Sequence, residues 1–313
     1  MARSIDKRGM PKDVWLKHCQ TFIGGSNAAA IMGQDKYNTR LDVYLQKTSP
    51  EPIVIPDNPL MRLGRELEPS IAKQYAELTG WRIVNDHKIR LHPKYDFIGG
   101  DIDRLILSPE HETPGIMEIK TIGYRTFAEW EEGEIPLSYR LQVHHYMMVH
   151  PTAKWGVIVA MLRETAELKI YPVEYYPELQ EVMEKEYYDF WQNHIEKHIP
   201  PPPETRQDIL KLFPDSQPVT VAAQESDIKV HGQLLVIKDT IDRLKAEEET
   251  LKLEIQKKML SAELMADGSK KYFIWKSQEQ NRLDIDTLKL EKPEIYNQYL
   301  KSKTIRVFLT KTK

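Results

Sequence analysis

Two acidic residues and a lysine, Asp103, Glu118 and Lys120, have the types and spacing that best indicate chemistry in this sequence. The segment Gly115–Thr121 has the composition of a β-strand, in which alternate side chains share a face. Glu118 and Lys120 are therefore expected to point the same way, with Ile119 in the core behind them. Asp103 is expected on the preceding strand of the same hairpin.

Two carboxylates that converge from adjacent strands form an oxygen-rich site suited to Mg²⁺ or Mn²⁺. A lysine beside them can orient a water molecule and stabilise developing negative charge. Hydrolysis of a phosphodiester needs a nucleophilic hydroxide and charge neutralisation, which one or two metal ions supply. A second ion would need Glu68, one step off the apolar stripe of a predicted helix. Asp101 shares the predicted strand face of Asp103, so either aspartate could be the ligand.

This pattern alone is weak, because charged residues at alternate strand positions usually face solvent and a lone helical glutamate is usually a surface residue. Three histidines, His144, His145 and His150, indicate packing on a partly apolar helix more than a metal site. The Gly24–Ser26 turn lacks the Gly-Lys-Ser/Thr ending of a nucleotide-binding loop, which argues against an NTPase. It suits a turn before a helix that binds a DNA phosphate.

Several periodic segments must position these residues. Apolar residues recur at helical spacing from Leu60 to Leu78, and Thr79–Gly80 is a plausible stop. The expected strands are Trp81–Asn85, His87–Leu91, Asp96–Leu107, Gly115–Thr121 and Lys154–Leu162, and further helices are expected at Leu137–His150 and Tyr176–His198. This order predicts an α/β (α+β) core with a central mixed sheet flanked by helices.

Four consecutive prolines, Pro200–Pro203, indicate a stiff linker. They divide the chain into a first domain at 1–199, a Pro-rich linker at 200–224 and a C-terminal region at 225–313. Apolar residues from Leu234 to Ile255 recur in steps of three and four, which predicts a long helix or two with coiled-coil packing, within the chain or as a dimer seam. A turn and a strand are expected at Asp267–Gly268 and Lys271–Ser277, and another strand at Thr304–Thr310. The basic C-terminal tail either touches DNA phosphates or forms a solvated surface.

The composition limits the classes of protein to which this chain can belong. The chain has 313 residues, 41% of them hydrophobic, so a sizeable core can form. The net charge of −3 argues against non-specific coating of nucleic acid. Its single cysteine, Cys19, excludes an internal disulfide and a four-cysteine zinc site, and fits a reducing compartment. The start of the chain lacks the apolar region of a secretory signal, and no apolar run is long enough to predict a membrane span.

Four blocks, in order over about residues 20–165, resemble the YqaJ-type viral recombinases, relatives of phage lambda exonuclease within the PD-(D/E)XK nuclease superfamily. They are Ile23–Gly33 with Tyr37 and Leu41–Lys47; Gly64–Pro69 with Tyr75 and Thr79–Gly80; the Asp103, Glu118 and Lys120 hairpin; and Trp130, Gly133, Ile135, Pro136, Tyr139 and Gln142. The segments Arg282–Asp284, Pro293–Tyr296 and Arg306–Phe308 match tails of family members more weakly.

The resemblance implies a restriction-endonuclease-like nuclease core with a C-terminal helical, coiled-coil and β-hairpin extension. It implies roles for particular residues. The implied catalytic set is Asp103, Glu118, Lys120, Glu68 and Gln142; the implied metal site is Asp103, Glu118, Glu68 and Ile119; and the implied DNA-binding residues are Ser26, Asn27, Tyr139, Lys17 and Arg140.

The implied function is a Mg²⁺-dependent exonuclease, with Mn²⁺ as a possible substitute and two ions in the site. It would degrade one strand of linear duplex DNA from the 5′ end and leave a 3′ overhang for a single-strand annealing protein. A ring-shaped trimer, encoded by a phage or prophage and acting in the bacterial cytoplasm, is also implied. The alternatives are a non-catalytic scaffold that binds DNA ends and an endonuclease of the same superfamily.

The sequence departs from the family pattern at three positions. Cys19 stands about where an arginine that grips the terminal phosphate is expected, and Lys17 or His18 could replace that arginine. Asn27 replaces a commonly acidic residue after the serine. Arg104 follows Asp103 where glycine is common.

Overall fold

The computed structural model describes residues 3–54, 56–127, 130 and 135–311. The chain divides into two compact units, Met1–Ile209 and Leu210–Lys313. Among the described residues, no helix is both long and apolar enough to cross a membrane.

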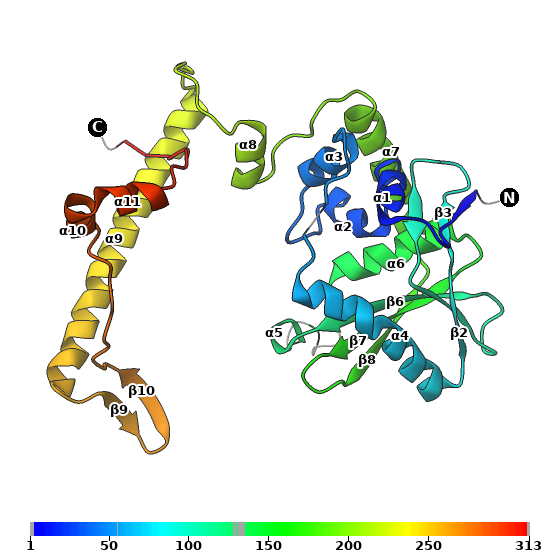
Figure 1. Cartoon of the computed structure of the whole chain (residues 1–313), viewed down its shortest axis with the longest axis horizontal. Coiled ribbons are helices and arrows are strands. Elements are labelled where there is room, and N and C mark those ends of the chain that lie inside the picture. The colour runs from blue at the N-terminus through cyan, green and yellow to red at the C-terminus, as the bar shows by residue number, and fades with distance from the viewer. Residues whose placement is uncertain (1–2, 55, 128–129, 131–134, 312–313) are drawn as a thin grey trace. The chain divides into compact units, whose positions relative to one another are not determined.

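A five-stranded mixed sheet forms the centre of the first unit (Figure 1). Its order is β2-β5-β6-β7-β8, with β6 and β7 parallel and the other neighbours antiparallel. The strands are β2 (Arg82–Asn85), β5 (Arg104–Leu107), β6 (Gly115–Ile122), β7 (Trp155–Leu162) and β8 (Leu168–Glu174). The predicted mixed sheet flanked by helices is confirmed, and β8 is a strand that the sequence analysis did not identify.

Helix α4 (Pro59–Thr79) covers one face of this sheet. Asn58 caps its start by accepting a hydrogen bond from the Met61 amide at 2.9 Å, and it ends at Gly80, whose φ of 70° few other residues adopt. Its apolar side packs against alternate residues of β6 and β7; this core contains Ile71, Ala72, Tyr75, Met117, Ile119, Val157, Val159 and Met161. Ile119 therefore lies in the core as expected.

Helix α6 (Leu137–Val149) covers the opposite face. The contact is close, since a Cβ atom on Gly156 of β7 would lie 2.7 Å from Val143 of α6. Because side chains alternate along a strand, Glu118 and Lys120 of β6 lie on this α6 side while Met117 and Ile119 lie on the α4 side. The buried His145 of α6 contacts the Gly99 carbonyl at 2.7 Å, which fits the packing role expected for the helix histidines.

A second, three-stranded sheet corrects one predicted element. The segment expected as one strand, Asp96–Leu107, is two strands, because β4 (Gly99–Asp101) pairs with β3 (Lys88–Leu91) and β5 pairs with β2 and β6. The order of the second sheet is β1-β3-β4, with β1 at Ser4–Asp6. Asp103 falls in the bend between the two strands rather than on a continuous strand.

Shorter helices complete the unit. They are α1 (Lys12–Gln20), η1 (Gly25–Asn27), α2 (Ala28–Ile31), α3 (Arg40–Thr48), α5 (Tyr124–Phe127), α7 (Pro177–Phe190), η2 (Trp191–Ile195) and α8 (Arg206–Leu212). The first compact unit ends at Ile209, within the segment predicted as linker, and the predicted domain bounds stay a prediction. The physical reason for this end is Asp208, which is fully buried and accepts hydrogen bonds from the Thr39 hydroxyl at 2.9 Å and the Thr205 amide at 3.0 Å.

The second unit contains one long helix, α9 (Glu225–Met259), and a hairpin of β9 (Leu264–Asp267) and β10 (Lys270–Ile274). Gly268, with a φ of 56°, lies in the hairpin turn at the predicted place. The helices α10 (Ile285–Glu291) and α11 (Pro293–Tyr299) follow. The predicted strand at Thr304–Thr310 is wrong, because no partner strand pairs with it within the described residues. Coiled-coil packing of α9 stays a prediction, and Ile237, Leu244 and Leu251 of its seam are exposed.

Candidate active site

Glu118, Lys120 and Gln142 form the centre of the candidate site. The Lys120 ammonium contacts the Glu118 carboxylate and donates to Gln142 Oε1 at 3.2 Å. The same ammonium lies 5.2 Å from the centre of the Tyr139 ring. Gln142 in turn donates to the Tyr146 hydroxyl at 3.0 Å. Side chains from β6 and α6 therefore hold Lys120 in one place between a carboxylate, an amide and an aromatic ring.

Asp103 joins this centre from the bend before β5. Its Oδ2 accepts a hydrogen bond from the Ile119 amide at 3.2 Å, which ties the bend to the middle of β6. Burial raises the pKa of Asp103, although the Lys120 ammonium opposes that shift. The charges of Asp103, Glu118 and Lys120 thus influence one another directly.

Glu118 is the most perturbed of the acids. Burial, followed by the nearby Asp103, raises its pKa from 4.5 to about 8, although Lys120 opposes the shift. Burial lowers the pKa of Lys120, but Glu118 and Asp103 outweigh burial, so its net shift is upward and the lysine stays cationic. A protonated or lysine-paired Glu118 is therefore the resting form near neutral pH without a metal ion.

Asp101 and Asp103 have different surroundings, which separates the two candidates that the strand pattern left open. Asp101 contacts the Lys7 ammonium and accepts from Trp15 Nε1 at 3.0 Å. Both partners come from the N-terminal segment and satisfy the two carboxylate oxygens. The structure therefore brings Asp103, and not Asp101, beside Glu118 and Lys120.

Glu68 reaches the site from the α4 side of the sheet. Its carboxylate forms an ion pair with Arg104, the first residue of β5. Burial and then Asp103 raise the pKa of Glu68, while Arg104 opposes the shift. Glu68 is thus electrostatically coupled to the other acids, although its direct partner is the guanidinium.

The donor set fits a divalent cation by its chemistry. Glu118 Oε2 is buried and has no hydrogen-bond partner among the described residues, a costly state that a bound cation would relieve. In the part of the chain that the structure describes, no three histidine, cysteine or acidic side chains converge closely enough to hold a metal ion. Glu118 pairs with Lys120, and Glu68 pairs with Arg104.

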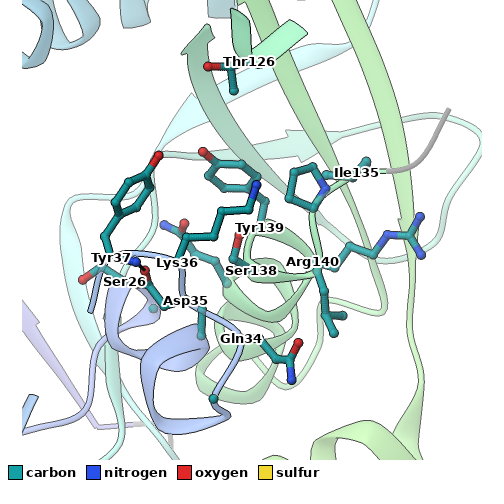
Figure 2. A pocket seen from close by; sticks show the side chains of 16 residues that line it. Ser26, Gln34, Asp35, Lys36, Tyr37, Thr126, Ile135, Ser138, Tyr139 and Arg140 are labelled. Carbon is teal, nitrogen blue, oxygen red and sulfur yellow. Dashed lines mark hydrogen bonds between the residues drawn. The ribbon is translucent and has the colours of Figure 1, made fainter. Parts of the chain in front are cut away.

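A pocket of about 970 Å³ lies between the loop after α2 and the start of α6. The loop after α2, with Lys36 and Tyr37, forms part of its lining, and the start of α6, with Ser138 and Tyr139, forms another part (Figure 2). Gln142 also lines the pocket, so one side chain belongs to both the pocket and the Lys120 centre. The volume is large enough for a nucleotide-sized ligand.

Three of the predicted DNA-binding residues, Ser26, Tyr139 and Arg140, line this pocket. Two others, Lys17 and Asn27, are not among the described lining residues. Asn27 is buried, where its amide accepts from the Gly24 amide at 3.1 Å and donates to Gln46 at 3.0 Å. Asn27 therefore stabilises the turn, and its expected contact with DNA stays a prediction. Lys17 is exposed on α1, and Gly133 of the fourth sequence block lies outside the described residues.

Lys36 is a pocket residue that the sequence pattern did not indicate. It directly precedes Tyr37, whose side chain is 89% exposed, in the loop that leads to α3. The described lining contains two basic residues, Lys36 and Arg140, and neither belongs to α1. The sequence did contain an indication of this loop, because a lysine and a tyrosine follow shortly after Gly33, whose φ is 66°. Such residues in a loop often contact a ligand.

Gly25 allows the turn to approach α6 closely, and we expect Gly25→Ala to destabilise the protein by about 1–3 kcal/mol, as overpacking does. A Cβ atom there would lie 2.7 Å from the ring of the buried Tyr146. Urea unfolding measures the loss. Gly24→Ala is the matched control, because its Cβ would lie 3.7 Å from the nearest atom, an ordinary contact. Equal destabilisation by both substitutions would contradict the close-approach argument.

This chain is similar to several known proteins. Residues 14–154 match the family model of the YqaJ-like viral recombinase domain. An uncharacterised protein YqaJ of Bacillus subtilis (strain 168) is 28% identical over 304 residues, covering 96% of this chain and 94% of that protein. The fold is similar to crystal structures of the alkaline exonuclease LHK-Exo from Laribacter hongkongensis, alone and in complex with dAMP. Each has a TM-score of 0.50 and 22% identity, and covers 59% of this chain and 93% and 92% of the respective solved chain.

The family match spans the turn at Ser26, the helix of Glu68, the bend at Asp103, Glu118 of β6, and Gln142 of α6. The resemblance expected from the sequence blocks is therefore confirmed. Over residues 14–154 this chain is similar to the YqaJ-like viral recombinase domain.

Proposed function

We propose that this chain is a divalent-metal-dependent exonuclease that degrades one strand of linear duplex DNA from the 5′ end and leaves a 3′ overhang. The main support for this proposal is the position of Gln142. Its side chain accepts a hydrogen bond from Lys120 and also lines the adjacent pocket. A terminal nucleotide seated in that pocket would place its phosphodiester near Glu118 and Lys120. The exonuclease named in the similar structures, one of them bound to dAMP, supports the same class of substrate.

The site residues divide the chemistry among them. Glu118 and Asp103 would hold Mg²⁺, or Mn²⁺ in its place, with Glu68 and the backbone at Ile119 as further candidates for a two-ion site. The bound metal would supply an activated water and neutralise charge on the phosphate. Lys120 keeps its proton in this environment and stabilises negative charge that develops on the phosphate oxygens. Gln142 fixes the Lys120 ammonium, so little reorganisation is needed during the reaction.

The pocket would select the DNA end. The exposed hydroxyl of Ser26, with Lys36 and Arg140, offers hydrogen-bond donors and positive charge to a 5′ phosphate. The Tyr139 ring offers a surface on which a base can stack. The resemblance to the family adds the remaining parts of the proposal: a ring-shaped trimer around DNA and delivery of the overhang to a single-strand annealing protein.

Digestion of end-labelled linear duplex DNA tests this function. With Mg²⁺, we expect the 5′ label to be released first while the complementary strand stays intact, and we expect 5′-phosphorylated ends to react faster than 5′-hydroxyl ends. Ser26→Ala should reduce the preference for phosphorylated ends. Ser70→Ala, at an exposed position of α4, is the control and should keep that preference. Release of the 3′ label first would contradict the proposed polarity.

Two further substrates separate the alternatives. Covalently closed circular DNA should remain intact, because an exonuclease needs an end; its cleavage would indicate an endonuclease. Tight, metal-independent binding to DNA ends without release of nucleotides would indicate a non-catalytic scaffold. Either result would replace the proposed exonuclease.

A further inference from the structure

Arg104 makes two contacts, one with the Glu68 carboxylate and one with the backbone of Asp103. Its guanidinium forms an ion pair with Glu68, and its Nη1 donates to the main-chain oxygen of Asp103 at 2.6 Å. The Arg104 side chain is 15% exposed and the Glu68 side chain 27% exposed, so the pair is shielded from much of the solvent. A guanidinium held in this way is a fixed positive charge, since arginine does not lose its proton in proteins.

The strand register explains why Arg104 reaches Glu68 and not Glu118. Arg104 lies opposite Met117 in the antiparallel pair of β5 and β6, and side chains of such pairs share a face. Met117 packs under α4, the helix that carries Glu68. Glu118 lies on the other face with Lys120. Each face of the sheet therefore pairs one glutamate with one cation.

The balance of charge favours one divalent ion over two. Glu68, Asp103 and Glu118 contribute three negative charges when ionised, and Lys120 and Arg104 return two positive charges. The remaining single negative charge suits one divalent ion. A second ion would have to bind in the field of the first ion and two cationic side chains, at separations where repulsion is large in a partly buried site.

We propose that Arg104 is a positioning residue that holds Glu68 in place of a second divalent cation, so that the site binds one ion tightly, at Asp103 and Glu118, and a second ion only weakly. This inference rests on the metal-dependent site of the proposed function. Its consequence is that Glu68 acts through its pairing with Arg104 rather than as a ligand of the tight ion.

Calorimetric titration of the metal-free full-length chain with MnCl₂, without DNA, tests the proposal. The wild type should bind one Mn²⁺ tightly. Arg104→Met should strengthen binding of the second Mn²⁺ by about tenfold or more, since it removes a fixed charge from the site. Arg104→Lys keeps the positive charge, so its second Mn²⁺ should bind as weakly as in the wild type. Arg82→Met, which removes an exposed arginine of the neighbouring strand β2, is the control and should not change either affinity.

Glu68→Gln gives an independent result that does not need the Arg104 variants to fold. Its effect on the tight Mn²⁺ should be less than threefold, because Arg104 and not that ion is the partner of Glu68. A loss above tenfold, two tight ions in the wild type, or an unchanged second affinity in a folded Arg104→Met would overturn the proposal. A chain that binds one Mn²⁺ tightly yet leaves DNA intact would instead contradict the proposed function, so the two failures are distinguishable.

Discussion

Replacing Glu118 by glutamine is expected to lower the DNA cleavage rate roughly 100- to 1,000-fold, the scale seen when one preorganised electrostatic group is removed. Glutamine keeps the shape of the side chain but removes the charge that a metal ion requires. The buried Oε2 of Glu118, which has no partner among the described residues, is the atom whose function is lost. Release of labelled nucleotides measures the rate, and Glu110→Gln, in the exposed turn between β5 and β6, is the control. Near wild-type cleavage by E118Q would remove Glu118 from the mechanism.

The same substitution should change how stability depends on pH. The pKa of Glu118 is raised from 4.5 to about 8 in the folded protein, so the folded state holds the proton more tightly than the unfolded state. The stability of the metal-free wild type should therefore be lost as pH rises from about 4.5 through about 8. E118Q lacks this loss, so its unfolding free energy relative to the wild type should rise by on the order of 4 kcal/mol between pH 5 and pH 9. Denaturant unfolding in EDTA measures the difference, and parallel pH profiles would contradict the assignment.

Lys120→Met is expected to reduce cleavage by roughly 100-fold and to shift metal binding to higher pH. The lysine opposes the upward pKa shift of Glu118, so its removal raises that pKa further. Mn²⁺ must then displace a more tightly held proton, and the midpoint of Mn²⁺ affinity against pH should move upward. The titration is made at several pH values on the metal-free chain.

Lys169→Met on β8 is the matched control for this variant, since Lys169 is 40% exposed and pairs with Glu167. It should leave both cleavage and the pH midpoint unchanged. A Lys120→Met variant that loses cleavage without any shift in the midpoint would show that Lys120 does not set the charge state of Glu118.

Local periodicity was sufficient to predict the part of the site that lies on one element. The alternation within β6 predicted that Glu118 and Lys120 share a face with Ile119 behind them, because that pattern needs only the strand itself. Helical spacing and the stop at Thr79–Gly80 similarly located α4. These features depend on neighbours in the sequence.

Contacts between distant segments could not be predicted in the same way. The strand pattern from Asp96 to Leu107 does not reveal that its two halves join different sheets, and so it left Asp101 and Asp103 equivalent. Their difference depends on Lys7 and Trp15, far away in the chain. The unit boundary had the same cause, since the partner that buries Asp208 is Thr39.

Gln142, which touches Lys120 and also lines the pocket, has a thermodynamic consequence. A nucleotide that moves this amide on binding must also change the energy of the Lys120 and Glu118 pair. By linkage, the factor by which the nucleotide alters Mn²⁺ affinity equals the factor by which Mn²⁺ alters nucleotide affinity. One hydrogen-bonding side chain, Gln142, would thus couple recognition of the DNA end to metal binding. A single coupling free energy would describe both effects.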